Sequence, residues 1–161
     1  MNSKAPSVPV QGIALILCIA FSFLAALGGV SGSPDSTWFQ NLEKPAFQPP
    51  NWLFGPVWSL LYLLIGISLW LVWRRGVLFK DVKLTVVFAV QWFLNLLWSV
   101  LFFGLENILL AQVGIVVLLG FIIWTIALFW KVDRWAGILL IPYLLWVSFA
   151  TFLTATLFAL N

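Results

Sequence analysis

The chain alternates between long apolar runs and short segments that carry its charges. Five runs are apolar over the roughly 20 residues that a helix needs to cross the hydrocarbon core of a bilayer; they cover 10–30, 52–73, 83–104, 108–130 and 135–158. No Asp, Glu, Lys or Arg lies in the interior of any run. The pattern predicts an all-α membrane protein: one five-helix transmembrane bundle forming a single domain over residues 1–161.

The charged residues are divided unequally between the two ends of this predicted bundle. One end carries seven of the eight basic residues, namely Lys4, Arg74, Arg75, Lys80, Lys83, Lys131 and Arg134. The other end has only Lys44, beside Asp35, Glu43 and Glu106. Because cytoplasmic loops are rich in Lys and Arg, we expect a cytoplasmic N-terminus and a C-terminus outside. A secretory signal peptide is the alternative for the first run, although that run exceeds the about 7–15 apolar residues of a signal core.

The connection over 31–51 is far longer than the other connections. Loops of this length in a compact domain are usually functional lids or disordered segments. Prolines near its end stiffen it, and it contains several aromatic residues that a solvated linker would not need. We therefore predict a lid folded over the bundle, with four residues singled out in it: Trp38, Lys44, Phe47 and Pro50.

Polar side chains inside the third run share one helix face. Gln91, Asn95 and Ser99 are spaced four apart, with Trp98 and Phe102 beside them. Amides left unsatisfied in hydrocarbon cost several kcal/mol, so this face is expected to point into the bundle. An interhelical hydrogen bond is one reading for Gln91, whereas the aromatic surroundings of Asn95 favour a ligand pocket.

The fifth run repeats this pattern and places it at a similar depth. Tyr143, Trp146 and Ala150 share a face, and Pro142 predicts a kink. At about 1.5 Å per residue, Asn95 lies roughly 14 Å and Trp146 roughly 18 Å below the outer surface, where Trp52 opens the second run. These three positions predict a lidded pocket for a flat, largely apolar ligand.

Composition excludes several kinds of chemistry. The 161 residues are 63% apolar and 8% charged, and they include eleven Trp, no His and one cysteine, Cys18. Without His, the commonest metal ligand and neutral-pH acid–base group is missing, so we predict no metal site. The absence of charge within the runs argues against a proton-coupled pump, and we read the basic excess as membrane topology, with no nucleic acid as partner.

The segment from Trp38 to Trp73 carries a specific motif. It reads WFQNLEKPAFQPPNWLFGPVWSLLYLLIGISLWLVW, and NLLWSVLFFG at 95–104 and PYLLWVSFA at 142–150 follow in order. These segments resemble the tryptophan-rich sensory protein and translocator protein family (TspO/MBR, formerly the peripheral benzodiazepine receptor). The resemblance runs from the first span to the last.

The resemblance implies a five-helix fold, usually homodimeric, with a pocket under the first loop. It also implies binding of porphyrins and related tetrapyrroles, with sterols or benzodiazepine-type drugs as further family ligands. Carried over to this chain, the family's pocket residues are Trp52, Asn95, Trp98, Ser99, Trp146 and Ala150. The chain departs from the family at Thr154, where Asn is common, and no basic residue follows Tyr143, so the animal sterol motif is absent.

Three functions fit these observations. The first is a membrane receptor or sensor-regulator that requires no cofactor and binds a protoporphyrin IX-like porphyrin or haem as ligand. The chain has no His and its only Met is Met1, and Cys18, Tyr62 and Tyr143 are poor substitutes as axial haem ligands, so we expect a preference for metal-free porphyrin. The second is light-dependent porphyrin degradation, with Trp52 and Trp146 as redox candidates. The third is transport of a tetrapyrrole or other hydrophobic solute.

Overall fold

A computed structural model describes residues 7–32 and 34–161 of the chain, so Lys4 lies outside the described residues. Within these residues, five helical segments are long and apolar enough to cross a membrane: Val8–Val30, Asn51–Arg74, Val82–Gly104, Ile108–Val132 and Arg134–Leu160. Their bounds lie within two residues of the predicted runs. The protein is therefore an all-α, multi-pass membrane protein, as the apolar pattern predicted.

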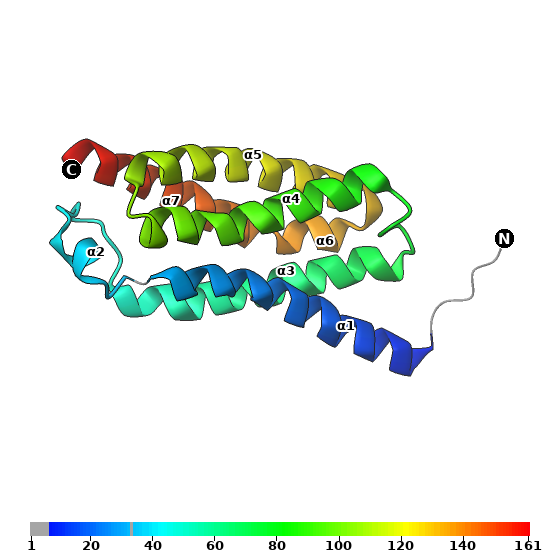
Figure 1. The fold of residues 1–161 in the computed structure, drawn as a ribbon. Helices are drawn as coiled ribbons and strands as arrows, with labels where there is room; N and C mark the ends of the chain where they lie inside the picture. The colour runs from blue at the N-terminus through cyan, green and yellow to red at the C-terminus, as the bar shows by residue number, and fades with distance from the viewer. Residues whose placement is uncertain (1–6, 33) are drawn as a thin grey trace.

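The five spans run along one another as a bundle (Figure 1). The first comprises α1 (Val8–Phe23) and the 3₁₀ helix η1 (Leu24–Ser31), and it packs along α3 (Phe54–Arg74). The third, α4 (Val82–Ser99), packs on α5 (Ile108–Val132), which also contacts α6 (Arg134–Leu139) and α7 (Ile141–Leu160). The loop with α2 (Thr37–Asn41) and η2 (Asn51–Leu53) lies at the same end of the bundle as the C-terminus (Figure 1).

Three of the spans depart from regular α-helix. The first tightens to 3₁₀ geometry at Leu24, and the third ends in a π-helical turn, η3 (Val100–Gly104). The fifth is broken at Leu140, where α6 ends and α7 begins with Pro142 in its first turn. The kink predicted at Pro142 is thus present, because proline has no N–H for the preceding turn but fits the start of a helix.

Two glycines in the spans allow backbones to approach closely. A Cβ added to Gly28 would lie 2.3 Å from the carbonyl oxygen of Leu96, so η1 touches the backbone of α4 there. A Cβ added to Gly66 would lie 2.5 Å from the Cα of Ile19, so α3 and α1 are in similar contact. Small residues of this kind let membrane helices pack by van der Waals contact. Gly28 therefore packs two spans of the same chain against each other.

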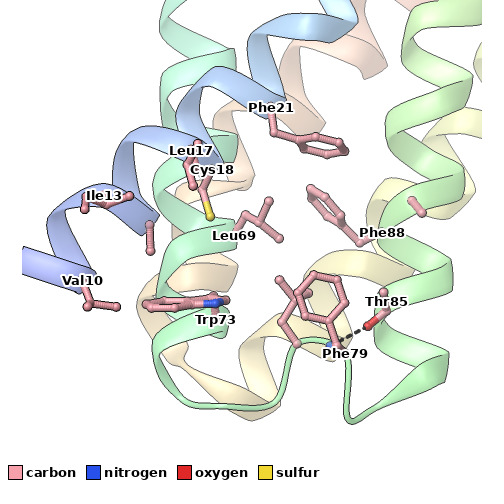
Figure 2. Close-up of a pocket in the computed structure, with 13 residues that line it drawn as sticks. Val10, Ile13, Leu17, Cys18, Phe21, Leu69, Trp73, Phe79, Thr85 and Phe88 are labelled. Carbon is pink, nitrogen blue, oxygen red and sulfur yellow. Dashed lines mark hydrogen bonds between the residues drawn. The ribbon is translucent and has the colours of Figure 1, made fainter. Parts of the chain in front are cut away.

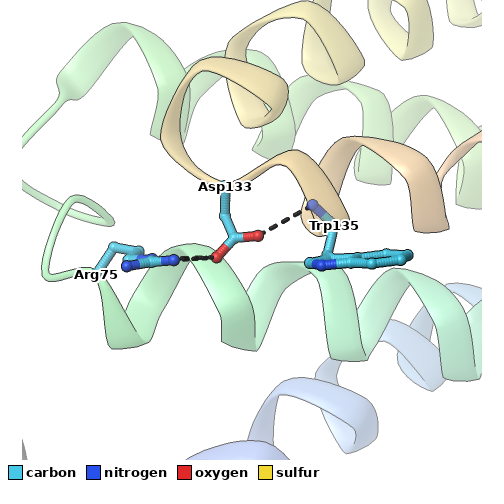
Figure 3. Close-up of polar contacts among 3 residues, drawn as sticks. All are labelled: Arg75, Asp133 and Trp135. Atoms are coloured by element: carbon cyan, nitrogen blue, oxygen red, sulfur yellow. Dashed lines mark hydrogen bonds and ion pairs between the residues drawn. The ribbon is translucent and has the colours of Figure 1, made fainter.

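An ion pair joins two connections at the basic end of the bundle. Arg75, just after α3, donates from Nε (3.0 Å) and from Nη2 (2.8 Å) to Oδ2 of Asp133 (Figure 3). The other carboxylate oxygen accepts from the backbone N–H of Trp135 and so caps α6. The Asp133 side chain is only 4% exposed, whereas that of Arg75 is 53% exposed. This contact fixes the end of α3 against the α5–α6 junction.

The pKa of Asp133 reflects these opposing influences. Burial raises the pKa, but the hydrogen bond from Arg75, those from the backbone amides of Trp135 and Ala136, and the guanidinium charge together hold it below its ordinary value. A carboxyl group with a depressed pKa stabilises the fold above its unfolded pKa of about 3.9. That contribution is lost as the pH falls through the lower pKa of the folded state.

We predict that Asp133→Asn destabilises the protein at pH 7 by about 1–2 kcal/mol, less than a fully buried pair would cost because half of Arg75 is exposed. The difference between this variant and the parent should begin to shrink below about pH 4, where the carboxyl group of the unfolded parent takes up a proton, and it should be lost as the pH falls through the lower pKa of the folded state. Thermal unfolding in detergent, followed by circular dichroism across this pH range, measures both effects. Lys131→Gln, in the same region, is the control and should leave stability unchanged; equal losses in both variants would contradict the assignment.

Candidate ligand-binding pocket

A chain of hydrogen bonds connects three spans in the middle of the bundle. Tyr62 on α3 donates its hydroxyl hydrogen to Oδ1 of Asn95 on α4 at 3.0 Å. Asn95 in turn donates from Nδ2 to the hydroxyl oxygen of Tyr143 on α7, also at 3.0 Å. All three side chains are buried. The amide predicted to face the interior therefore does so, and it is held in one orientation by two tyrosines.

A cavity of about 220 Å³ lies beside this chain of hydrogen bonds, toward the end of the bundle that carries the loop. All five spans contribute to its wall, and so do Gly32 and Pro34 of the loop. The aromatic part of the wall consists of Phe54, Trp58, Tyr62, Trp98, Phe103 and Trp146. The wall is thus mainly apolar and aromatic, with a few polar groups, which is the usual character of small-molecule sites.

Aromatic contacts hold the indole rings of this wall in place. Trp58 stacks on Tyr62 with ring centroids 5.4 Å apart, and Trp98 stacks on Phe102 at 5.2 Å. Trp146 meets Phe54 edge to face at 5.9 Å. Rings fixed in this way present flat faces without losing rotamer entropy when a ligand binds.

One fully buried polar atom of the wall has no hydrogen-bond partner among the described residues. The indole nitrogen of Trp98 is buried and makes no hydrogen bond there. Such a buried donor costs free energy unless a partner is supplied, so it is suited to an acceptor on a ligand. The carbonyl oxygen of Gln91, one turn before Asn95, also lacks a partner in the described chain, so the interhelical hydrogen bond considered for Gln91 is not formed through that atom.

Five of the six sequence-predicted pocket residues lie together in this wall: Asn95, Trp98, Ser99, Trp146 and Ala150. Trp52 does not. It lies in η2, its side chain is 71% exposed, and it does not line the cavity. Trp58, almost two turns further along the second span, occupies the place that we expected for Trp52. The spacing of Trp58 and Tyr62, four residues apart and so on one helix face, was the pattern that could have identified it.

The loop over 31–51 packs on the bundle through its aromatic residues. Trp38 contacts Phe102 edge to face at 5.4 Å, and Phe47 stacks on Phe152 at 5.3 Å. Lys44 donates to the carbonyl oxygens of residues 40 and 42 and lies over the ring of Phe39. None of the four predicted lid residues, Trp38, Lys44, Phe47 and Pro50, lines the cavity itself. Trp38 and Phe47 anchor the loop to the bundle, whereas Lys44 makes its contacts within the loop.

A pair of hydrogen bonds fastens this loop to α7. The Asn161 side chain accepts from the backbone N–H of Glu43 at 2.9 Å and donates to the carbonyl oxygen of Glu43 at 3.1 Å. The amide thereby pairs with the loop backbone as a neighbouring strand would. We call this pair of contacts the Asn161 clasp. It is exposed to solvent, so it is a weak closure that can open without disturbing the bundle.

Comparison with known proteins agrees with this architecture. The model of the TspO/MBR family matches residues 14–160, a range that contains every residue of the cavity wall. The chain belongs to the TspO/MBR family. It is 44% identical to the tryptophan-rich protein TspO of Archaeoglobus fulgidus over 91% of this chain and 98% of the relative.

Two further relatives show how widely this family similarity extends. The tryptophan-rich protein TspO of Chlorobaculum tepidum is 41% identical over 94% of this chain and 98% of its own length. The human translocator protein is 33% identical over 91% of this chain and 86% of its own length. This TspO/MBR chain therefore matches these relatives along the full set of spans, loop included.

Thr154, where the sequence departs from the family pattern, is buried and donates its hydroxyl hydrogen to the carbonyl oxygen of Ala150 at 2.8 Å. The hydroxyl group is therefore satisfied within α7. It does not contribute to the cavity wall, so the departure leaves the wall itself unchanged.

We predict that Asn161→Ala loosens the loop while the spans stay folded. Loss of two exposed hydrogen bonds, each contributing about 1 kcal/mol or less, should speed amide hydrogen exchange around Glu43 by roughly tenfold. Exchange in detergent, read by mass spectrometry of peptides covering 37–50, measures this effect. Thr156→Val on the same helix is the control, because the Thr156 hydroxyl bonds only within α7. Unchanged exchange at Glu43 in Asn161→Ala would show that the clasp does not hold the loop.

Proposed function

We propose that this protein is a membrane sensor-regulator that binds porphyrins and related tetrapyrroles in the cavity beside Asn95. The observation that carries the proposal is the convergence of three fixed indole rings, Trp58, Trp98 and Trp146, on one apolar cavity within the bundle. Indole faces stack on flat conjugated ligands, and aromatic pairs contribute about 0.5–1.5 kcal/mol beyond the buried area. The Asn95 amide and the free N–H of Trp98 supply the polar contacts that orient a ligand.

The size of the cavity implies that the loop moves when a macrocycle binds. A volume of about 220 Å³ is below the roughly 300–1,000 Å³ of typical ligand sites. The loop contributes Gly32 and Pro34 to the wall and is held by the exposed Asn161 clasp. Opening of this segment is the change that costs least, since the remaining wall is built from packed spans. Smaller flat ligands, such as benzodiazepine-type drugs, need less opening.

The chemistry of the wall favours metal-free porphyrin over haem. The lining contains no His, Cys or Met side chain, and the hydroxyl group of its one tyrosine, Tyr62, already donates to Asn95; these four residue types are the axial ligands of haem proteins. The one cation near the loop, Lys44, is already bonded to backbone carbonyl oxygens. Binding therefore relies on ring contacts more than on the propionate groups, and no cofactor is required.

Orientation and assembly complete the proposal. Six basic residues of the described chain lie at the end opposite the loop (Arg74, Arg75, Lys80, Lys83, Lys131 and Arg134), which supports a cytoplasmic N-terminus. The cavity and its loop then open toward the outer side. A homodimer is part of this proposal as a family expectation.

We predict that Ala150→Leu weakens protoporphyrin IX binding by roughly tenfold or more, because added methyl groups overfill a site whose packed walls cannot retreat. Ala155→Leu is the matched control: it is the same change on the same helix, at an exposed position. Absorbance titration of the purified protein in detergent gives both dissociation constants. Equal affinities in the two variants would place the ligand elsewhere.

A ligand panel refines this test. We expect haem to bind more weakly than protoporphyrin IX, and the dimethyl ester of protoporphyrin IX to bind as tightly as the free acid. A six-coordinate haem spectrum, or strong dependence on the propionates, would contradict the proposed site while leaving tetrapyrrole binding itself intact.

Light-dependent degradation is the second candidate, and one observation favours it: the oxidisable indole rings of Trp58 and Trp146 line the cavity. The exposed Trp52 is poorly placed for this chemistry.

If the protein degrades its ligand, illuminated protoporphyrin IX should disappear faster with the protein than in detergent alone, and Trp146→Phe should slow that loss several-fold without abolishing binding. Absorbance under constant illumination measures the rate. A rate equal to that of pigment in detergent would eliminate this function; transport would then be tested by pigment flux across vesicles.

A further inference from the structure

A second, larger cavity lies on the opposite half of the bundle, away from the chain of hydrogen bonds. It has a volume of about 590 Å³ and lies between α1, α3 and α4 (Figure 2). Its lining is almost wholly apolar. The polar groups among the lining side chains are the Thr85 hydroxyl, the Cys18 thiol and the Trp73 indole nitrogen. The rim on α1 is open, with Ile13 59% and Leu17 62% exposed. We call this cavity the α1–α4 groove.

The groove exists because α1 diverges from α4 toward its N-terminal end (Figure 1). Contact with α4 ends at Phe21, whose ring stacks on Trp92 at 4.7 Å and whose carbonyl oxygen accepts from the Trp92 indole at 3.2 Å. Contact with α3 continues to Gln11, whose carbonyl oxygen accepts from the Trp70 indole at 3.1 Å. At the other end the groove is closed by the turn after α3, where Phe79 adopts a positive φ of 70°. The backbone N–H of Phe79 donates to Thr85 at 3.1 Å, which fixes this turn (Figure 2).

The length of the groove corresponds to one leaflet of a bilayer. From Val10 to Phe21 the α1 wall covers twelve residues, a rise of about 16 Å, close to half of the roughly 30 Å hydrocarbon core. One end therefore lies at the membrane boundary and the other near the midplane. An acyl chain that follows α1 would fill this space from its glycerol end to its methyl end.

The mouth of the groove is basic. Arg74 and Lys80 directly follow Trp73 and Phe79, which line the groove, and the Arg74 guanidinium lies over the ring of Trp70 on α3 at 5.0 Å. The Lys80 ammonium folds over the turn, 3.7 Å from the position of a Cβ at Gly76, and makes no ion pair among the described residues. The Trp73 indole nitrogen likewise has no hydrogen-bond partner in the described chain, and an indole at this depth is placed to donate to an ester carbonyl.

We propose that the α1–α4 groove binds one anionic diacyl phospholipid, with an acyl chain along α1 and its phosphate at Arg74 and Lys80. Attraction to cations favours anionic lipids at such a mouth. A second copy of the chain is the alternative occupant, and the dependence of Cys18 protection on protein concentration distinguishes it from a lipid.

The single cysteine provides a direct test. Cys18 lines the groove and is the only thiol in the chain, so a bound lipid should slow its alkylation by N-ethylmaleimide. Delipidated protein in detergent is titrated with dioleoyl phosphatidylglycerol or dioleoyl phosphatidylcholine, and alkylation is followed by intact mass. We expect phosphatidylglycerol to protect Cys18 at concentrations at least fivefold lower than phosphatidylcholine.

Substitutions test separately whether the basic residues and the apolar groove contribute to lipid binding. Arg74→Gln and Lys80→Gln should each weaken phosphatidylglycerol protection by about fivefold, the value of one basic side chain near an anionic surface. Lys83→Gln is the matched control, because Lys83 lies over Trp124 of α5 instead, and it should have no effect. Ala89→Trp fills the groove and should abolish phosphatidylglycerol retention in native mass spectrometry, whereas Val116→Trp on the exposed face of α5 should not.

Four results would overturn the proposal. Equal protection by both lipids, or equal loss in Lys83→Gln, would show that the anionic headgroup is not recognised at Arg74 and Lys80. Retention of phosphatidylglycerol by Ala89→Trp, with its circular dichroism spectrum unchanged, would show that the lipid does not bind in the groove. Protection of Cys18 that rises with protein concentration in the absence of lipid would identify the groove as an interface between copies of this chain. None of these measurements involves the cavity beside Asn95, so they do not depend on the proposed tetrapyrrole function.

Discussion

The need to satisfy polar groups inside hydrocarbon governs how this bundle is assembled. No water is available there to replace a missing hydrogen bond, so an amide such as Asn95 must find partners on other spans. It finds them on α3 and α7, through Tyr62 and Tyr143. These bonds draw three spans together at one depth, and the cavity lies directly beside the point where they meet.

The same constraint makes α3 the span to which the others are tied. Ser22 on α1 donates to the backbone carbonyl of Tyr62 at 2.6 Å, and Ser68 on α3 donates to a carbonyl of α6 at 2.7 Å. At the basic end, Arg75 joins α3 to Asp133. Polar contacts of α3 therefore reach four other parts of the chain, from the loop-side half of the bundle to the opposite surface. The aromatic rings of the cavity are positioned by this frame, since Trp58 and Tyr62 lie on α3 itself.

Much of this architecture could be predicted from residue patterns, and the misses have physical causes. Apolar run length determines spans well, because bilayer thickness leaves little choice. The inward face of Asn95 followed from the cost of an unsatisfied amide. The depth of Trp52 does not determine where its side chain points. Trp52 opens the second span in η2, before the α-helix that sets side-chain direction begins. The direction in which a side chain points from a helix depends on where the helix starts. Trp58 points into the cavity because it lies on the same face of α3 as Tyr62.

The divergence of α1 is a different kind of miss. At the end of the first span, Gly28 lies against the backbone of α4 of the same chain. Because η1 is held close while α1 diverges from α4, one span closes the cavity beside Asn95 and opens the α1–α4 groove. Nothing in the period of an all-apolar run reveals this, since lipid-facing and groove-facing positions are equally apolar.

The two cavities also differ in how much they can discriminate. An apolar wall distinguishes ligands that differ by a methylene by only about 1–3 kcal/mol, whereas a site built around hydrogen bonds rejects a ligand that leaves its polar groups unpaired far more strongly. In the cavity beside Asn95, each end of the amide already has one tyrosine partner, and the buried Trp98 N–H has none among the described residues. With so few polar groups in the wall, selectivity under the proposed function comes mainly from ring shape, which accounts for why the residues point to a class of flat ligands and not to a single compound.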